Sequence, residues 1–378
     1  MRRYLDHNAT TPLRPEARAA MIDAMDVIGN PSSVHVEGRA AKALIEQARV
    51  QVAKAMGAQP GEVVFTSGAT EAINLAFAQD WGFSACSPLE HDAVLKQTAA
   101  LARHPVTGQA LVDQGGQFLG TDPGVYRDFQ PHDRAIFALT AANSETGAVQ
   151  PVGAAVQALK QIAPQAHFLC DATQALGKIR FDFAQTGCDY AAVSAHKIGG
   201  PKGVGALIVR QGLDITSGSL GGGQELGRRS GTENVIGIAG FGAACAAAAQ
   251  DIEKDAWKPV AELRNILEKA LEADAKTTIL LGNGGARLPN TLCFATPGWK
   301  GETQVMQMDL AGFAVSAGSA CSSGKVKAST VLRAMGYDDE TASSAIRVSL
   351  GLTTTKDDVL RFAQAWLSKE KLFRARAA

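Results

Sequence analysis

Short apolar runs alternate with amphipathic helical patterns through the middle of the chain. The stretch "GEVVFTSGATEAINLAFAQ" (61–79) predicts a strand, a glycine turn and a helix. The stretch 134–163 predicts a strand, a loop and a helix, and 188–210 predicts two strands joined by an irregular, glycine-rich loop. Strands that alternate with helices in this way are typical of an α/β protein built on a central sheet.

The final third of the chain has a different pattern and predicts a second, smaller α+β unit. Charged residues become denser and a proline appears at 251–259, which indicates a domain boundary or a connecting helix. Beyond it, amphipathic helices flank two apolar strands around "LPNTLCFAT" and "IRVSLGL". A chain of 378 residues is long enough for two such domains.

Composition and charge exclude several function classes. The chain has 37 Lys and Arg against 37 Asp and Glu, so no basic excess favours nucleic acid as a partner. No apolar run reaches the roughly 18 residues that span a bilayer, and we expect no membrane partner. The six cysteines form no CxxC pair and no metal-ligand spacing, which predicts reduced thiols, a cytoplasmic location and no metal site.

Two polar residues stand where predicted apolar strands end. Lys197 follows a strand in "VSAHKIGGPKG", and Asp171 ends the strand in "AHFLCDATQ". Taken singly, Lys197 is better explained as a surface lysine in a glycine turn than as a cofactor ligand. Asp171 alone fits a helix N-cap as well as it fits a cofactor ligand. Together they predict a pyridoxal phosphate site at one edge of the sheet, with Lys197 as the Schiff-base amine and Asp171 beside the ring nitrogen.

A phosphate site is predicted where the first of these strands meets its helix. In "FTSGATEAIN" the glycine permits a close backbone approach, Thr70 offers a hydroxyl, and the helix start offers free N–H groups. Ser194 and His196 stand two residues apart, so both side chains can face the same phosphate. His91 in "SPLEHDAVL" has two interpretations, a ring that stacks on the cofactor and moves protons, or a helix cap.

One cysteine stands among small, flexible residues. In "VSAGSACSSGK" (315–325) nothing near Cys321 is large enough to bury it. An exposed thiol is open to oxidation, so this placement suggests a chemical role.

Taken together, these segments resemble the class I cysteine desulfurases, the NifS/IscS-like enzymes of the aminotransferase class V family. The resemblance runs from "YLDHNATTP" to about Gly351 and includes the segments "SGATEAINLA", "LEHDAV", "ANSETGAVQP", "CDATQALGK", "SAHKIGGPKGVGAL", "GGGQE", "RRSGTEN", "GSACSSGK" and "IRVSLG". It implies the pyridoxal-phosphate fold type I, with a mostly parallel seven-stranded sheet in a large domain (12–250) and a small domain (1–11 and 251–378). It also implies a homodimer that uses L-cysteine and passes sulfur to acceptor or scaffold proteins for iron–sulfur clusters or other sulfur compounds.

The resemblance assigns roles by position. Lys197 would bind the cofactor aldehyde and Cys321 would be the nucleophile that takes the sulfur as a persulfide. The other assigned residues are Asp171 at the ring nitrogen, Gln174 at the phenolic oxygen, Ala69, Thr70, Ser194 and His196 at the phosphate, Thr232 at the phosphate of the other subunit, His91 over the ring, and Arg347, assisted by Asn30, at the substrate carboxylate.

Two positions depart from the family pattern. Asn143-Ser144 replaces the usual Asn-Asn, so Ser144 stands where an amide contacts the cofactor–substrate adduct, and either a water or a shift of Asn143 would compensate. Leu352 replaces an arginine and removes a positive charge near the site. Selenocysteine lyase activity, another reaction on the same fold and a weakly active platform for cluster-assembly proteins remain the alternatives.

Overall fold

A mixed, mostly parallel core sheet organises the larger part of the molecule. The computed structural model describes residues 2–101, 110–112, 118–121, 134–318 and 328–377. The strand order is β2 (Val63–Thr66), β9 (Gly205–Val209), β8 (Tyr190–Ser194), β7 (His167–Asp171), β6 (Ala135–Thr140), β3 (Phe83–Cys86). Strands β8, β7, β6 and β3 are parallel, and β9 is antiparallel to both neighbours.

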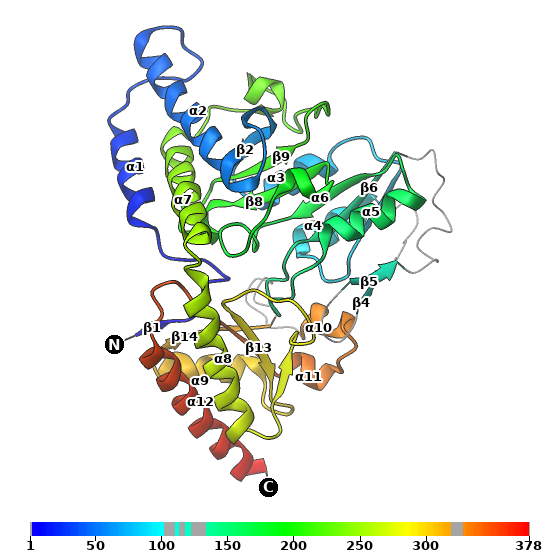
Figure 1. The fold of residues 1–378 in the computed structure, drawn as a ribbon, viewed down its shortest axis with the longest axis vertical. Coiled ribbons are helices and arrows are strands. Elements are labelled where there is room, and N and C mark those ends of the chain that lie inside the picture. The colour runs from blue at the N-terminus through cyan, green and yellow to red at the C-terminus, as the bar shows by residue number, and fades with distance from the viewer. Residues whose placement is uncertain (1, 102–109, 113–117, 122–133, 319–327, 378) are drawn as a thin grey trace.

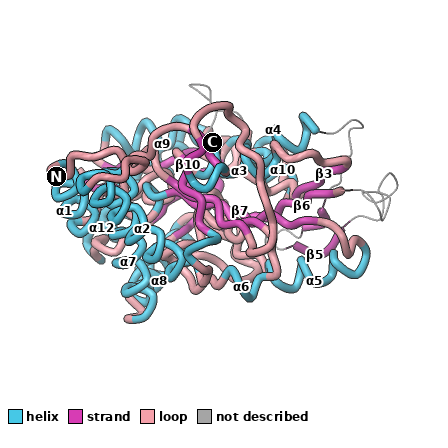
Figure 2. The backbone as a smooth tube through the Cα atoms, turned by 90° about the horizontal axis from the view of Figure 1, so that it is seen from above, coloured by secondary structure: helices cyan, strands magenta, loops and turns pink. Residues whose placement is uncertain are grey.

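The strands are apolar throughout because both faces of the sheet are buried. One face packs on α3 (Ala69–Phe77) and α4 (Asp92–Leu101), and the other on α2 (Val36–Met56), α5 (Val152–Ile162) and α7 (Val235–Glu253), with α1 (Pro15–Met25) outside (Figures 1 and 2). Successive strand residues point to opposite faces, so Val64 and Ile136 pack on the first face and Phe65 and Phe137 on the second. This arrangement confirms the predicted fold class.

The sheet has six strands in the described parts of the chain, rather than the seven expected. The segments β4 (Ala110–Val112) and β5 (Phe118–Thr121) pair with each other as an antiparallel hairpin instead of extending the core sheet. The expected number of strands is therefore wrong for the described residues, although the mostly parallel character is right.

A second, antiparallel sheet forms the lower part of the molecule in Figure 1. Its order is β12 (Ile279–Leu281), β13 (Thr291–Ala295), β16 (Ala345–Ser349), β15 (Ser316–Ala317). Around it lie α8 (Trp257–Asp274), α9 (Gly301–Leu310), α10 (Thr330–Ala334), α11 (Asp339–Ser343) and α12 (Lys356–Ala377). Phe294 and Trp366 meet edge to face in its core, with ring centroids 5.0 Å apart.

The N-terminal segment crosses from the small sheet to the large one. β1 (Arg3–Tyr4) pairs with β14 (Phe313–Ala314), and Leu5 packs in the core of the small unit. We propose the domain bounds 12–250 and 1–11 with 251–378; the break between α7 and α8, where Asp255 has a positive φ of 52°, supports this division.

Helix α7 is long and apolar enough to cross a membrane by length and composition alone. However, 56% of its apolar window is buried in the protein, where it packs on α1 and α2. This burial is typical of a core helix.

Candidate active site

The carboxyl ends of five strands meet at one edge of the core sheet. Strands β2, β3, β6, β7 and β8 end there, at Thr66, Cys86, Thr140, Asp171 and Ser194. Thr140 pairs with Asp171 and Asp171 with Ala192, so Asp171 lies in the middle of this edge. Lys197 follows β8 in a short 3₁₀ turn (Ala195–Lys197) and lies at the same edge. The structure therefore places the predicted acid and amine at the same edge of the sheet.

The Lys197 amine is held by the N-terminal segment. Its Nζ donates hydrogen bonds to the main-chain carbonyls of Asn8 at 2.6 Å and Ala9 at 2.9 Å. These bonds offset the cost of partly burying the amine. Asn8 and Ala9, near the start of the chain, thereby set the position of a lysine almost 190 residues later.

Asp171 is 8% exposed and is held by the turn that follows β7. Its Oδ1 accepts the N–H of Thr173 at 3.0 Å. The carboxylate is thus fixed at the end of the strand by the local backbone. The same turn places Gln174, whose Nε2 donates to the Asn8 carbonyl at 3.0 Å.

Glu90 is a second buried acid at this edge that the sequence reasoning did not single out. It is 2% exposed, and its Oε1 accepts the Thr140 N–H at 2.5 Å. Burial, reinforced by the nearby Asp171 charge, raises the pKa of Glu90 well above its ordinary value. This shift favours the protonated form of Glu90 beside Asp171.

The start of α3 forms a cradle that fits a phosphate. No side chain in the described part of the chain caps this helix, which begins at Ala69 after Gly68. Ser194 Oγ lies beside Gly68, 3.8 Å from where a Cβ would stand. A Cβ on Gly205 would lie 2.7 Å from the Gly68 Cα, so this close approach requires glycine. The free N–H groups of Ala69 and Thr70, together with the Ser194 hydroxyl, suit an anion.

The two predicted site histidines have different environments. His196 Nδ1 lies 3.2 Å from Thr10 Oγ1, and burial together with the Lys197, Lys202 and Lys178 charges lowers its pKa to about 4. His196 is thus uncharged at neutral pH and can hold a phosphate only through hydrogen bonds. His91 Nδ1 accepts the Ala93 N–H at 3.1 Å, so the ring caps α4, as the alternative interpretation predicted.

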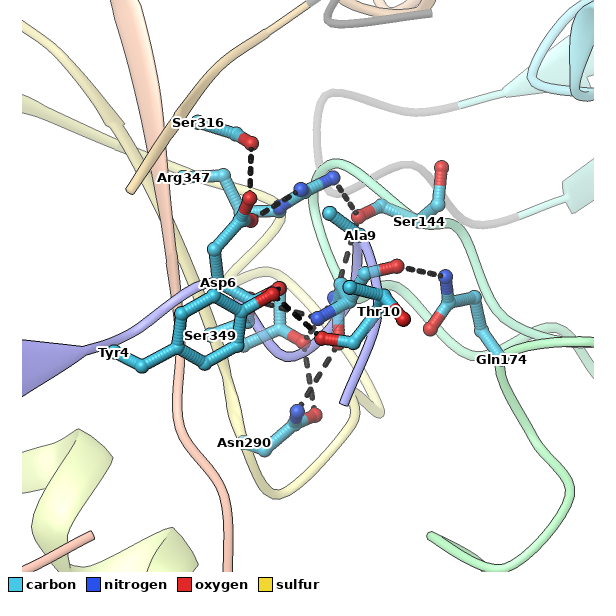
Figure 3. Close-up of polar contacts among 12 residues, drawn as sticks. Tyr4, Asp6, Ala9, Thr10, Ser144, Gln174, Asn290, Ser316, Arg347 and Ser349 are labelled. Atoms are coloured by element: carbon cyan, nitrogen blue, oxygen red, sulfur yellow. Dashed lines mark hydrogen bonds and ion pairs between the residues drawn. The ribbon is translucent and has the colours of Figure 1, made fainter. Parts of the chain in front are cut away.

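Arg347 lies on β16 of the small sheet and reaches across to the site. Its Nη2 donates to Asp6 Oδ1 at 2.7 Å and its Nη1 to the Ser144 carbonyl at 3.0 Å (Figure 3). Asp6 is held in turn by the Ser316 hydroxyl at 2.8 Å. The Arg347 Nε is buried without a hydrogen-bond partner among the described residues, which leaves one donor for a ligand.

The side chains of Asn143 and Ser144 make, among the described residues, no contact that points to a substrate role. Asn143 is engaged in its own turn, since its Oδ1 accepts the N–H groups of Glu145 and Thr146 and its Nδ2 donates to the Leu89 carbonyl. Ser144 meets Arg347 through its main-chain carbonyl. A substrate contact by the Asn143 side chain stays a prediction.

Asn30 is not joined to this group within one chain, whereas Thr232 lies near the start of α3. Asn30 lies in the loop between α1 and α2, at the far end of these helices from the small sheet that carries Arg347 (Figure 1). Thr232 is exposed and lines a small cavity of about 60 Å³ with Ser67 and Glu225. Cys321 lies outside the described residues.

A buried acid after β6 makes the stability of the fold depend on pH. Glu145 is half-buried as a residue, but its carboxyl is enclosed and accepts the Ser329 hydroxyl at 2.5 Å. Burial, the largest cause, raises its pKa to about 7, although the Ser329 bond and the Arg347 and His91 charges act in the opposite direction.

We expect Glu145→Gln to flatten the pH dependence of the unfolding free energy. The native state keeps the Glu145 proton up to about pH 7, whereas the unfolded chain loses it at its ordinary, lower pKa. The contribution of Glu145 to stability is therefore lost as pH rises between these values, by about 2 to 3 kcal/mol. Urea unfolding at pH 5 and pH 7.5 measures it. The exposed Glu302→Gln serves as control, and parallel curves for wild type and Glu145→Gln would contradict the expectation.

Comparisons with known proteins agree with this geometry. The family model for aminotransferase class-V matches residues 3–362. The cysteine desulfurase IscS of Dictyoglomus turgidum is 38% identical over 94% of this chain and 91% of its own length. A solved NifS-like protein superposes with a TM-score of 0.88 at 33% identity, covering 98% of this chain and 100% of that one. The solved structure of SspA in complex with cysteine gives a TM-score of 0.76 at 27% identity, covering 93% of this chain and 100% of that one.

These matches confirm the resemblance that the sequence segments indicated. The family is pyridoxal-phosphate dependent, and the donor set at the sheet edge fits that cofactor, with an amine for the aldehyde, an acid for the ring nitrogen and an uncapped helix start for the phosphate. The chain therefore belongs to the aminotransferase class-V family, among its pyridoxal-phosphate-dependent cysteine desulfurases.

Proposed function

We propose that this protein removes sulfur from L-cysteine, forming L-alanine and a persulfide on Cys321. The observation that carries the proposal is the convergence of Lys197, Asp171 and Arg347 at the junction of the two sheets, with one buried donor of Arg347 unpaired. The cysteine bound in the related SspA structure supports the substrate.

Pyridoxal phosphate, when bound, supplies an electron-withdrawing ring that stabilises negative charge at the substrate Cα. Asp171 would keep a positive charge on the ring nitrogen, since the Thr173 N–H fixes its carboxylate at the end of β7. The start of α3 and Ser194 would hold the phosphate, and Gln174 would donate to the phenolic oxygen.

Lys197 has two tasks in this proposal. Its amine would hold the cofactor through the aldehyde, and as a free amine it would take the proton from the substrate Cα. The carbonyls of Asn8 and Ala9 hold this amine near the sheet edge while it carries the proton.

Cys321 completes the reaction. Its thiolate attacks the substrate sulfur, the sulfur–Cβ bond breaks, and the electron pair of that bond stays with the three-carbon product, which takes up protons to become alanine. The transferred sulfur remains on Cys321 as a persulfide, so no outside oxidant is needed. A proton transfer through His91 would help form the thiolate.

We propose further that the enzyme is a cytoplasmic homodimer that hands its sulfur to acceptor or scaffold proteins. The loop that carries Thr232 also exposes Leu220 fully and Leu226 to 89%, which is unusual for a free surface and suits a subunit contact. In such a dimer Thr232, and equally Asn30, would serve the site of the other subunit.

Replacing Arg347 by lysine is expected to raise the KM for L-cysteine by roughly 10- to 100-fold, with a smaller effect on kcat. Lysine keeps the charge but cannot bond Asp6, the Ser144 carbonyl and a substrate carboxylate in fixed directions. Steady-state alanine formation measures both constants. Arg361→Lys, on the exposed side of α12, is the control, and an unchanged KM in Arg347→Lys would count against the role of Arg347.

The proposed function is tested by incubating the cofactor-loaded protein with L-cysteine and a thiol reductant. We expect equal amounts of alanine and sulfide, and without reductant a persulfide on the peptide that contains Cys321. A parallel assay with selenocysteine separates the lyase alternative. Bound cofactor with no alanine formed from cysteine would refute the proposal.

A further inference from the structure

A second lysine lies behind the predicted cofactor site. Lys178, in the turn after β7, is 3% exposed. Its Nζ donates to Asn8 Oδ1 at 3.0 Å and to Gln174 Oε1 at 2.5 Å. Burial, together with the Lys197 and Arg347 charges, lowers its pKa well below the ordinary lysine value. An amine nitrogen carries at least two N–H groups, one for each of these two acceptors.

The amide groups that Lys178 contacts are forced into one orientation. An amine N–H can donate only to the oxygen of an amide, so both Oδ1 of Asn8 and Oε1 of Gln174 must face Lys178. The nitrogen of Gln174 therefore points away from Lys178, as a donor. The nitrogen of Asn8 likewise donates to the Ser144 carbonyl at 3.2 Å and to Thr291 Oγ1 at 2.8 Å.

Asn8 links this network to Lys197. Its main-chain carbonyl accepts both Gln174 Nε2 and Lys197 Nζ. Asn290 Nδ2 donates to Asn8 Oδ1 at 3.0 Å, and the Asn8 N–H donates to Ser349 Oγ at 2.9 Å. The residue is 1% exposed, and each of its polar atoms has a partner.

We propose that Lys178 is a positioning residue for the cofactor: its amine fixes the Gln174 amide with the NH₂ group toward the phenolic oxygen, and it fixes Asn8, which holds Lys197. This inference rests on the proposed function. It assigns a role to a residue that touches neither substrate nor cofactor and acts through Gln174 and Asn8.

Several charged and titratable groups lie near Lys178, and a pH titration must distinguish their proton exchange from that of the cofactor. Lys197 and Arg347 act on Lys178, and the charge of Lys178 in turn acts on His7 and His196. Burial lowers the pKa of each histidine to about 4, so neither changes its charge near neutral pH. A pH titration above pH 6 therefore reports on the cofactor and the lysines.

The test is a pH titration of the visible absorption of the bound cofactor in Lys178→Met. Methionine keeps the volume and removes both donors, so only the Asn8 carbonyl still orients the Gln174 amide, and its NH₂ group is held less firmly toward the phenolic oxygen. Without a fixed donor, the phenolic oxygen would accept a stronger hydrogen bond from the protonated lysine-bound nitrogen, which would raise the pKa of that nitrogen. We expect the titration midpoint to rise by about half to one pH unit.

Gln174→Ala and the double variant show whether Lys178 acts through Gln174. We expect the shift in the double variant to be no larger than the larger single shift, because both changes remove the same donor. Lys54→Met, an exposed lysine on α2, should leave the midpoint unchanged. Lys178→Gln keeps an NH₂ group on a shorter side chain, gives a smaller shift in the same direction, and replaces Lys178→Met if the latter does not fold.

Two results would overturn the inference. A midpoint within about 0.2 pH unit of wild type in Lys178→Met, or single shifts that simply add, would show that Lys178 is only structural. In both cases wild type still binds the cofactor and forms alanine, so the proposed function stands. A wild-type protein with no visible band would refute the proposed function as well as the inference.

Discussion

Replacing Lys197 by alanine is expected to lower the rate of alanine formation by at least about 10³-fold. The variant loses the amine that binds the cofactor aldehyde and the base that takes the Cα proton, and no neighbour can replace both. Lys178 belongs to the same hydrogen-bond network, but its amine donates to Asn8 and Gln174 and is buried. Single-turnover alanine formation and the visible absorption of the purified protein measure the loss.

The neighbouring lysine provides the control for this prediction. Lys202 lies in the same glycine-rich loop but is exposed, so Lys202→Ala should keep most of the activity. If Lys197→Ala kept more than about a tenth of the wild-type rate, the assignment of the amine would be wrong, since general base catalysis alone contributes at least 10²-fold.

Cys321→Ser should abolish persulfide formation and lower alanine formation by on the order of 10³-fold. A serine hydroxyl is far less ionised than a thiol near neutral pH and cannot accept sulfur as a persulfide. Mass spectrometry after incubation with isotopically labelled cysteine measures the transfer, and the bound cofactor should stay unchanged. Persulfide formed at an undiminished rate in Cys321→Ser would refute the role of this thiol.

Cys86 is a demanding control because it ends β3 at the same sheet edge as Asp171. Burial, together with the Glu90 charge, raises the pKa of its thiol to about 12, so it is not a thiolate at neutral pH. We expect Cys86→Ser to retain full persulfide formation on Cys321. Label found on Cys86 in the wild type would contradict this expectation.

The sequence was sufficient to predict the residues whose position depends on strand ends. Asp171 and Lys197 follow apolar runs, and parallel buried strands are recognisable as such runs, so their meeting at one edge follows from topology. The start of α3 could be predicted for the same reason. In contrast, the number of strands was not predictable, because β4 and β5 are too short to indicate whether they pair with the sheet or with each other.

The residues that the sequence did not reveal depend on contacts between distant segments. Asn8 bonds residues 136 to 341 positions away, and no local pattern marks such a residue. Lys178 did carry a signal: a lysine four residues after Gln174, in an otherwise apolar stretch, is suited to contact that glutamine. Glu90 could be noticed only once its burial was known.

The first fourteen residues connect the two domains and touch the reactive amine on the way. β1 pairs with β14 in the smaller unit, and the carbonyls of Asn8 and Ala9 accept the Lys197 amine. The Arg14 guanidinium donates to the carbonyl of Ile198, the residue directly after that lysine. Any rotation of the small domain would therefore displace this N-terminal segment and, through its hydrogen bonds, Lys197. An affinity tag fused ahead of residue 1 is thus a poor choice for kinetics, and a tag placed after α12 is the safer one.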